Sequence, residues 1–243
     1  MKVIPVIDIL NGAVVHAVRG KRKEYQPLQS ILTKSVEPLE VAKAFGSLGF
    51  TELYVADLDA IIDCSTNFQN LNTIVNVTGL KLMVDAGVTG IERAQRLLDS
   101  GVSKLIIGTE TLQTKSFLGE AVRLFGSDRV VVSLDLKGDK ILVKLGFNGC
   151  KNPLCLLQDF KAMGGSKVIV LDLARVGSGE GVDVDFLKNV IAEVGVAVYV
   201  GGGVRDINDL IELKNIGASG ALVATALHTG KISIDALKRK GFL

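Results

Sequence analysis

Short apolar runs rich in β-branched residues alternate with amphipathic stretches along the whole chain. The apolar runs predict eight strands, over residues 3–8, 52–57, 81–85, 104–108, 129–135, 167–172, 196–201 and 221–225. Helical periodicity follows each run, over residues 37–49, 68–78, 90–100, 114–125, 152–164, 183–194, 206–216 and 232–240. Near-continuous apolar strands are typical of a parallel sheet that is covered on both faces.

Eight strand–helix units in 243 residues predict a (β/α)8 TIM barrel, with residues 1–243 forming a single domain. The alternative is a doubly wound open sheet, which usually carries a glycine fingerprint at its first strand–helix turn. Here that turn reads DILNGAVVHAVRG, which predicts a small hairpin excursion and favours the barrel.

The two halves of the chain resemble each other. Residues 81–112 align without a gap on residues 197–228, and Asp8 and Asp57 align with Asp135 and Asp172. This predicts a barrel built from two repeated half-barrels. One mismatch stands out, because the first copy has Asp85-Ala86 where the second has two glycines, at 201 and 202.

Composition narrows the class of protein. The net charge is +2, and the one basic cluster, RGKRKEY at 19–25, predicts a solvated loop, so no nucleic-acid partner is expected. No apolar run approaches the roughly 20 residues that span a bilayer, and no signal peptide is expected, which indicates a cytoplasmic protein without a membrane partner. Cys64, Cys150 and Cys155 have no metal-like spacing and are predicted to be reduced thiols, with Cys155 buried in a helix.

Five predicted strands end on an aspartate. Such barrels hold their sites at the carboxyl ends of the strands, although a single aspartate there is often only a cap. Asp8 and Asp135 occupy equivalent positions in the two halves and would face each other across the barrel mouth. Two carboxyl groups in that arrangement can act as general acid and general base once their environments separate their pKa values. No His/Cys cluster indicates a metal or redox cofactor, so none is expected.

The loops after strands 7 and 8 predict an anion site. Gly201-Gly202-Gly203 precedes a predicted helix, and the turn VATALHTG follows strand 8. Backbone N–H groups at a helix N-terminus bind phosphate, and these two loops form the usual phosphate site of TIM barrels.

Several longer motifs carry a family resemblance: IPVIDILNGAVVHAVRG, GFTELYVADLDA, SGVSKLIIGTETL, VVVSLDLKGDKILV and VGGGVRDINDLIELKNIGASGALVATAL. Over essentially its whole length the chain resembles the HisA/HisF family of histidine-biosynthesis barrel isomerases and cyclases. The resemblance implies an Amadori rearrangement of an N-glycosidic aminoaldose to an aminoketose, in which one aspartate protonates the ring oxygen and the other moves the C2 proton. Asp8 and Asp135 stand at those two positions.

The same resemblance implies two groups of binding residues. The phosphate-binding group is Gly177, Gly202, Gly203, Ala224 and Thr225. The substrate-binding group is His16, Asp57, Asp85, Gly108, Thr109 and Asp172. Two of these roles stay open, because Asp85 could instead cap the next helix and point away from the cavity, and His16 could be an exposed residue. His228 is expected to be structural.

The departures from the family pattern affect the binding of one of the two phosphates. The isomerase binds a phosphate in each half-barrel, but here Asp85 replaces a glycine, and a carboxylate beside a phosphate costs about 1 to 4 kcal/mol. Leu171 stands in place of a threonine, Val176 in place of a site aspartate, and His16 in place of an arginine. Ala224-Thr225 also replaces the usual Gly-Lys.

These departures predict a HisA-like isomerase that acts on a ribose-phosphate conjugate with one phosphate, outside the histidine pathway. Two alternatives remain: the histidine-pathway isomerase itself with altered phosphate anchoring, and a non-catalytic barrel that binds a phosphorylated ligand. The cyclase receives ammonia from a glutaminase, and no signature of such a docking face is visible, so no glutaminase partner is expected.

Overall fold

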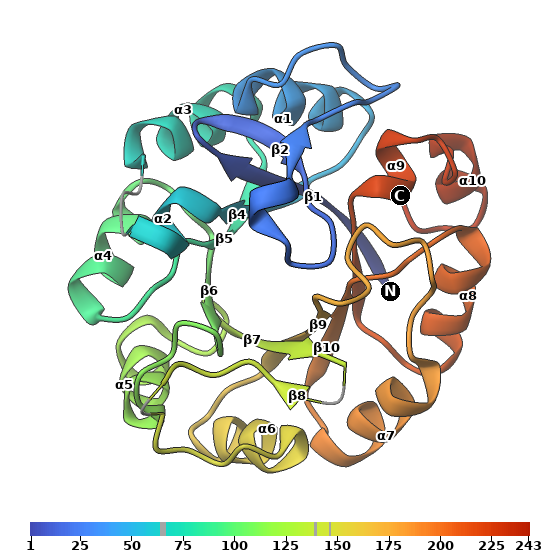
Figure 1. Ribbon diagram of the computed structural model, residues 1–243. Coiled ribbons are helices and arrows are strands. Elements are labelled where there is room, and N and C mark those ends of the chain that lie inside the picture. The colour runs from blue at the N-terminus through green and yellow to red at the C-terminus, as the bar shows by residue number, and fades with distance from the viewer. Residues whose placement is uncertain (64–66, 139, 146) are drawn as a thin grey trace.

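A ring of eight parallel strands forms the centre of the molecule (Figure 1). The computed structural model describes residues 1–63, 67–138, 140–145 and 147–243. The ring consists of β1 (Lys2–Leu10), β4 (Glu52–Asp57), β5 (Lys81–Asp85), β6 (Lys104–Gly108), β7 (Val130–Lys137), β9 (Lys167–Asp172), β10 (Ala197–Gly201) and β11 (Gly220–Val223). It closes through parallel pairing of β11 with β1, with Lys2 opposite Gly220, so the predicted (β/α)8 barrel is confirmed.

Helices surround this ring (Figure 1). They are α1 (Pro38–Ser47), α3 (Phe68–Thr78), α4 (Ile91–Asp99), α5 (Lys115–Phe125), α6 (Pro153–Ala162), α7 (Val184–Val194), α8 (Ile207–Asn215) and α10 (Ile234–Arg239). Each lies within a predicted helical stretch. Two short helices, α2 (Leu58–Asp63) and α9 (Thr225–His228), were not predicted. Strand β11 ends two residues earlier than predicted, because the amides of Leu227 and His228 donate to the Ala224 carbonyl and start α9.

Short additional segments follow the carboxyl ends of two barrel strands, β1 and β7. After β1 the chain forms β2 (Ala13–His16), the 3-10 turn η1 (Arg22–Glu24) and β3 (Gln26–Pro27). Strand β2 pairs antiparallel with β1, with Asp8 opposite Val15, which confirms the predicted hairpin. This excursion lies over the ring of strands (Figure 1). Strand β8 (Lys140–Ile141) pairs with the end of β7 in the same way.

Side-chain alternation along the strands divides the core into two parts. The inner cluster fills the barrel with one face of every strand; its members are Ile4, Tyr54, Met83, Ile106, Val131, Ile169, Tyr199 and Leu222, among others. The opposite faces pack beneath the helices in a larger cluster. Because successive side chains of a strand point to opposite faces, each strand-end residue is directed either into the barrel or away from it.

The cysteines differ from the prediction. Cys150 and Cys155 form a disulfide that joins the loop after β8 to the first turn of α6, with Cα atoms 6.1 Å apart. Cys155 does lie in a helix, but it is half-buried. The prediction of reduced thiols was therefore wrong for this pair, because chain folding brings two cysteines within bridging distance. Cys64 lies outside the described residues. No described helix is long and apolar enough to span a bilayer.

Candidate active site

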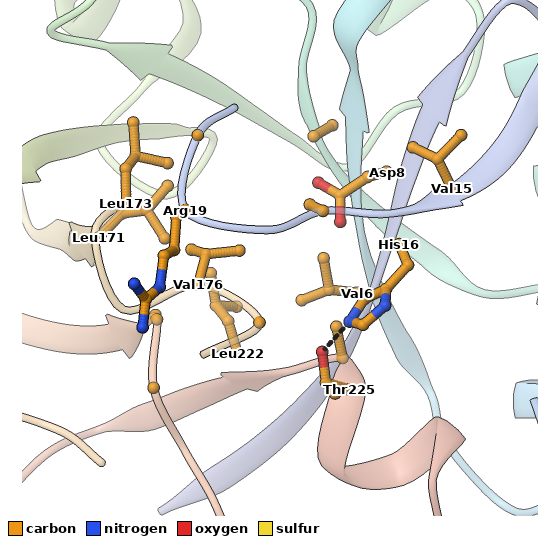
Figure 2. A pocket seen from close by; sticks show the side chains of 18 of the residues that line it. Val6, Asp8, Val15, His16, Arg19, Leu171, Leu173, Val176, Leu222 and Thr225 are labelled. Carbon is orange, nitrogen blue, oxygen red and sulfur yellow. Dashed lines mark hydrogen bonds between the residues drawn. The ribbon is translucent and has the colours of Figure 1, made fainter. Parts of the chain in front are cut away.

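A cavity of about 500 Å³ lies at the carboxyl ends of the barrel strands. Predicted site residues that line it are Asp8, His16, Asp85, Asp135, Gly177, Gly202, Gly203, Ala224 and Thr225. Figure 2 shows Asp8, His16 and Thr225 projecting into this space opposite an apolar wall that includes Leu171 and Val176. The cavity therefore brings together residues from both halves of the chain.

Strand alternation separates the five strand-end aspartates into two groups. Asp8, Asp85 and Asp135 follow the inward-facing positions of their strands and line the cavity. Asp57 and Asp172 are one position out of phase, and neither lines it. The Asp57 Oδ1 accepts a hydrogen bond from the Ala60 amide at 3.0 Å. These two predicted substrate-binding residues thus have local structural roles.

The side chain of Asp172 is held within its own loop. Its Oδ1 accepts from the Ala174 amide at 2.9 Å, and its Oδ2 accepts from the Arg175 Nε at 3.1 Å. This ion pair orients the loop that carries Gly177, one of the cavity-lining glycines. Asp172 therefore supports the cavity wall from behind.

Asp135 is held rigidly by its neighbours. The Ser133 hydroxyl donates to its Oδ1 at 2.7 Å, and the Glu110 amide donates to its Oδ2 at 3.1 Å. The predicted residue Thr109 is fully buried beside it, and its Oγ1 accepts from the Asp135 amide at 3.0 Å. Burial raises the pKa of Asp135 to about 6, while the two donated hydrogen bonds oppose the rise because they stabilise the charged form.

Asp8 has no such support. No described residue donates a hydrogen bond to its side-chain carboxyl, and burial alone raises its pKa to about 7. Two carboxyl groups on opposite sides of the same cavity thus differ in environment: two donated hydrogen bonds favour the ionised form of Asp135, and no described residue donates one to Asp8. That difference is what a general acid and a general base require.

Asp85 lies in the turn after β5. The equivalent turn in the second half of the chain carries the glycine run Gly201 to Gly203. The Asp85 Oδ1 accepts from the Gly87 amide at 3.1 Å, so this side chain caps the turn after β5 while still facing the cavity. Burial, followed by the nearby charge of Asp135, raises its pKa to about 7. The predicted residue Gly108 lies beneath the pair: a Cβ there would sit 2.9 Å from the Asp135 Oδ2 and 3.2 Å from the Asp85 Oδ2.

The glycines of the second half form a tight cradle. Gly202 and Gly203 have φ angles of +88° and +98°, which side-chain-bearing residues rarely adopt. A Cβ at Gly202 would overlap the Asp172 carbonyl oxygen, and one at Gly203 would overlap the Gly181 carbonyl oxygen. Close packing of these two loops therefore depends on glycine.

The two histidines have different surroundings. The His16 Nε2 lies 3.0 Å from the Thr225 Oγ1 (Figure 2), so His16 is half-buried in the cavity and not merely exposed. The His228 Nδ1 lies 2.9 Å from the Ser30 Oγ, and its ring packs edge-on against Phe45. Burial lowers the pKa of His228 to about 4, which keeps it neutral and fits the expected structural role.

Sequence reasoning missed several cavity residues. Tyr54 is 3% exposed and lines the cavity among the three inward-facing aspartates, whose charges add to burial in raising its pKa. Its position on the Ala56 side of β4 was the available signal. Arg22 belongs to the cluster predicted as a solvated loop, yet it is half-buried and pairs with Glu110 at 2.6 Å. Lys231, near the glycine cradle, also lines the cavity.

Within the described ranges, no group of three or more His, Cys, Asp or Glu side chains is arranged to hold a metal ion.

Comparison with known proteins gives concordant matches along the chain. The histidine biosynthesis protein family matches residues 2–233. An uncharacterised protein of Methanocaldococcus jannaschii is 33% identical over 243 residues, covering 99% of both chains. The 1-(5-phosphoribosyl)-5-((5-phosphoribosylamino)methylideneamino)imidazole-4-carboxamide isomerase of Campylobacter concisus is 34% identical over 99% of this chain and 100% of its own. The enzyme of the same name from Halobacterium salinarum is 30% identical over 96% and 93%.

Proposed function

This chain belongs to the histidine biosynthesis family of HisA/HisF barrels, and we propose that it is an isomerase with a substrate other than that of the histidine pathway. The proposed reaction is an Amadori-type rearrangement of a ribose-phosphate conjugate with one phosphate. The proposed catalytic residues are Asp8 and Asp135, and the proposed phosphate site comprises Gly177, Gly202, Gly203, Ala224 and Thr225. We treat residues 1–243 as one catalytic domain.

The two carboxyl groups divide the proton transfers. Asp8, with a pKa of about 7, is protonated in about half of the molecules near neutral pH, and this form donates its proton to the ribose ring oxygen as the bond from that oxygen to C1 breaks. The glycosidic nitrogen supplies its electron pair and becomes an iminium group. Asp135, held ionised by the Ser133 hydroxyl and the Glu110 amide, then removes the C2 proton to give an enaminol. Loss of the C2 hydroxyl proton and protonation at C1 complete the aminoketose.

The Asp85 side chain occupies the turn after β5, and this observation supports a substrate different from that of the histidine pathway. The printed name of the isomerase relatives contains two phosphoribosyl groups. In this chain the Asp85 side chain already accepts the Gly87 amide hydrogen bond, and it brings to the first turn a carboxyl group that becomes negatively charged as the pH rises through about 7. A second phosphate there would lose that donor and meet repulsion of about 1 to 4 kcal/mol.

Complementation and kinetics test this proposal together. We expect the gene not to rescue a strain that lacks the histidine-pathway isomerase. The purified protein should convert the histidine intermediate at least about 1000-fold more slowly than an authentic enzyme, which corresponds to roughly 4 kcal/mol of lost transition-state binding. Efficient conversion would refute the altered substrate.

A screen of metabolite extracts should identify the true substrate. The double variant Asp8→Asn/Asp135→Asn is the control, since it removes both proton-transfer groups but keeps their shape. Each single variant should abolish turnover of the identified substrate and leave circular dichroism unchanged. Retained turnover in either single variant would remove that residue from the mechanism.

A further inference from the structure

The cavity has opposite charge character at its two ends. Carboxyl groups gather at the ends of β1, β5 and β7 and in the loop after β6, where Asp8, Asp85, Asp135 and Glu110 line the cavity. Basic side chains line the part near the glycine cradle, namely Arg19, Arg205 and Lys231. Arg19 is paired with Glu180 and Arg205 with Asp209, whereas no described residue forms an ion pair with Lys231, so the cationic character of this end comes mainly from Lys231.

Among the described residues, the basic side chains that line the cavity on this side are Arg22 and the exposed Lys137, which follows Asp135 on β7. The Arg22 Nη2 lies 2.6 Å from the Glu110 Oε2. Glu110 therefore takes up most of the Arg22 charge. The Asp85 and Asp135 Oδ2 atoms flank the same point above Gly108, at 3.2 and 2.9 Å, so they lie within about 6 Å of each other. Like charges at that spacing repel, and a bound cation would relieve the repulsion.

Hydrogen-bonding groups at this end remain without partners. The side chain of Tyr54 is 3% exposed, its ring lines the cavity, and no described residue forms a hydrogen bond with its hydroxyl. Asp85, 8% exposed, uses Oδ1 for the Gly87 amide, while no described residue donates to its Oδ2. The Tyr54 hydroxyl and the Asp85 Oδ2 are therefore available to form hydrogen bonds with a ligand group that enters the cavity.

We propose that the acidic end, formed by Asp85 and Tyr54 beside Asp135, binds a cationic nitrogen group of the substrate. An ionised carboxylate only accepts hydrogen bonds, so the complementary group must donate them. An ammonium group does so and also carries the charge that this end requires. This inference rests on the proposed function, because it assumes that the single phosphate occupies the glycine cradle. The substrate is then a sugar phosphate conjugate with a phosphate at one end and a protonated amine at the other.

Matched synthetic ligands test the two ends separately. The probes are alkyl monophosphates of four to eight carbons whose far end carries an amino group, a hydroxyl group or a second phosphate. Isothermal titration calorimetry at pH 8 gives their affinities for the wild-type protein. For at least one of these carbon-chain lengths, we expect the aminoalkyl phosphate to bind at least about tenfold more tightly than the hydroxyalkyl phosphate. The bisphosphate should bind most weakly. Equal affinities, or a preference for the bisphosphate, at every length would overturn the inference.

Three variants assign the preference to residues. Asp85→Asn should abolish the preference for the amine, and Tyr54→Phe should reduce it by removing a single hydroxyl. Glu24→Gln is the control, because it removes one exposed carboxylate from η1, outside the residues that line the cavity, and it should behave as wild type. An amine preference that survives both Asp85→Asn and Tyr54→Phe in folded protein would contradict the assignment.

The phosphate end has its own readout. Inorganic phosphate should bind wild type and all three variants equally. If neither inorganic phosphate nor any monophosphate binds, the cradle assignment of the proposed function fails, and simple alkylammonium chlorides then decide the amine site alone. Binding of these amines that Asp85→Asn removes would support the site, and absence of binding would refute it.

Discussion

Replacing the proposed general acid should make this protein more stable. Asp8 ionises near pH 7 in the folded protein but near its ordinary value of 3.8 when unfolded. The folded state therefore holds its proton more tightly, and stability falls as the pH rises from about 4 to about 7. Above that range the folded protein carries an ionised carboxylate that burial disfavours. Asn has the same shape without the charge, so Asp8→Asn removes this cost.

The size of the gain follows from the two pKa values. They differ by about 3, and each pKa unit corresponds to 1.36 kcal/mol, which sets an upper limit of about 4 kcal/mol at pH 8. Asp8 is only half-buried, so relaxation and solvent reduce this figure, and we expect about 1 to 3 kcal/mol. For a chain of this length the corresponding increase in Tm is roughly 2 to 12 °C.

Thermal unfolding followed by circular dichroism at pH 4 and pH 8 measures the effect. The difference in Tm between Asp8→Asn and wild type should be near zero at pH 4 and largest at pH 8. Glu24→Gln serves as the control, because its exposed carboxylate should change stability by less than about 0.5 kcal/mol at either pH. A variant that is equally stable with wild type at pH 8, or one stabilised to the same extent at both pH values, would refute the reasoning.

Three further predictions concern the cradle and the ion pair. Gly202→Ala should abolish inorganic phosphate binding in calorimetry and lower the Tm, because its Cβ overlaps the Asp172 carbonyl, whereas Gly46→Ala in helix α1 has free space and should stabilise by about 0.5 to 1 kcal/mol. Crystals soaked in sulfate should show one anion, at Gly202, Gly203 and Thr225; equal density beside Asp85 and Gly108 would disprove the single-phosphate proposal. Arg22→Ala removes a positive charge that lowers the pKa values of Asp85 and Asp135. The acidic limb of the pH–rate profile should therefore move to higher pH, and an unchanged limb would exclude this coupling.

The sequence by itself determined the architecture. Eight apolar runs alternating with helical periodicity were sufficient to predict the closed barrel, since each strand must bury both faces and each helix must cover one of them. The internal alignment also singled out Asp8 and Asp135, and it marked Asp85 as the position where the two halves differ. Family resemblance pointed to the same chemistry, and the family itself is confirmed.

The direction of the strand-end side chains could be predicted in part from the sequence. Asp57 and Asp172 ended strands just as Asp8, Asp85 and Asp135 did, so position along the chain alone placed all five in the site. Counting alternation from the inward-facing residues of each strand separates the two groups. The same count would have identified Tyr54 from its place on the Ala56 side of β4.

Only the tertiary structure decided the remaining contacts. Arg22 meets Glu110 across 88 positions of sequence, and His16 meets Thr225 across 209, because barrel closure brings the first loop against distant ones. The Cys150–Cys155 disulfide depends on how one loop folds back onto α6. Asp85 caps its turn and faces the cavity together, although sequence reasoning treated these roles as alternatives. Burial by the assembled barrel raises the pKa values of its carboxyl groups, and the hydrogen bonds from Ser133 and Glu110 keep that of Asp135 below that of Asp8.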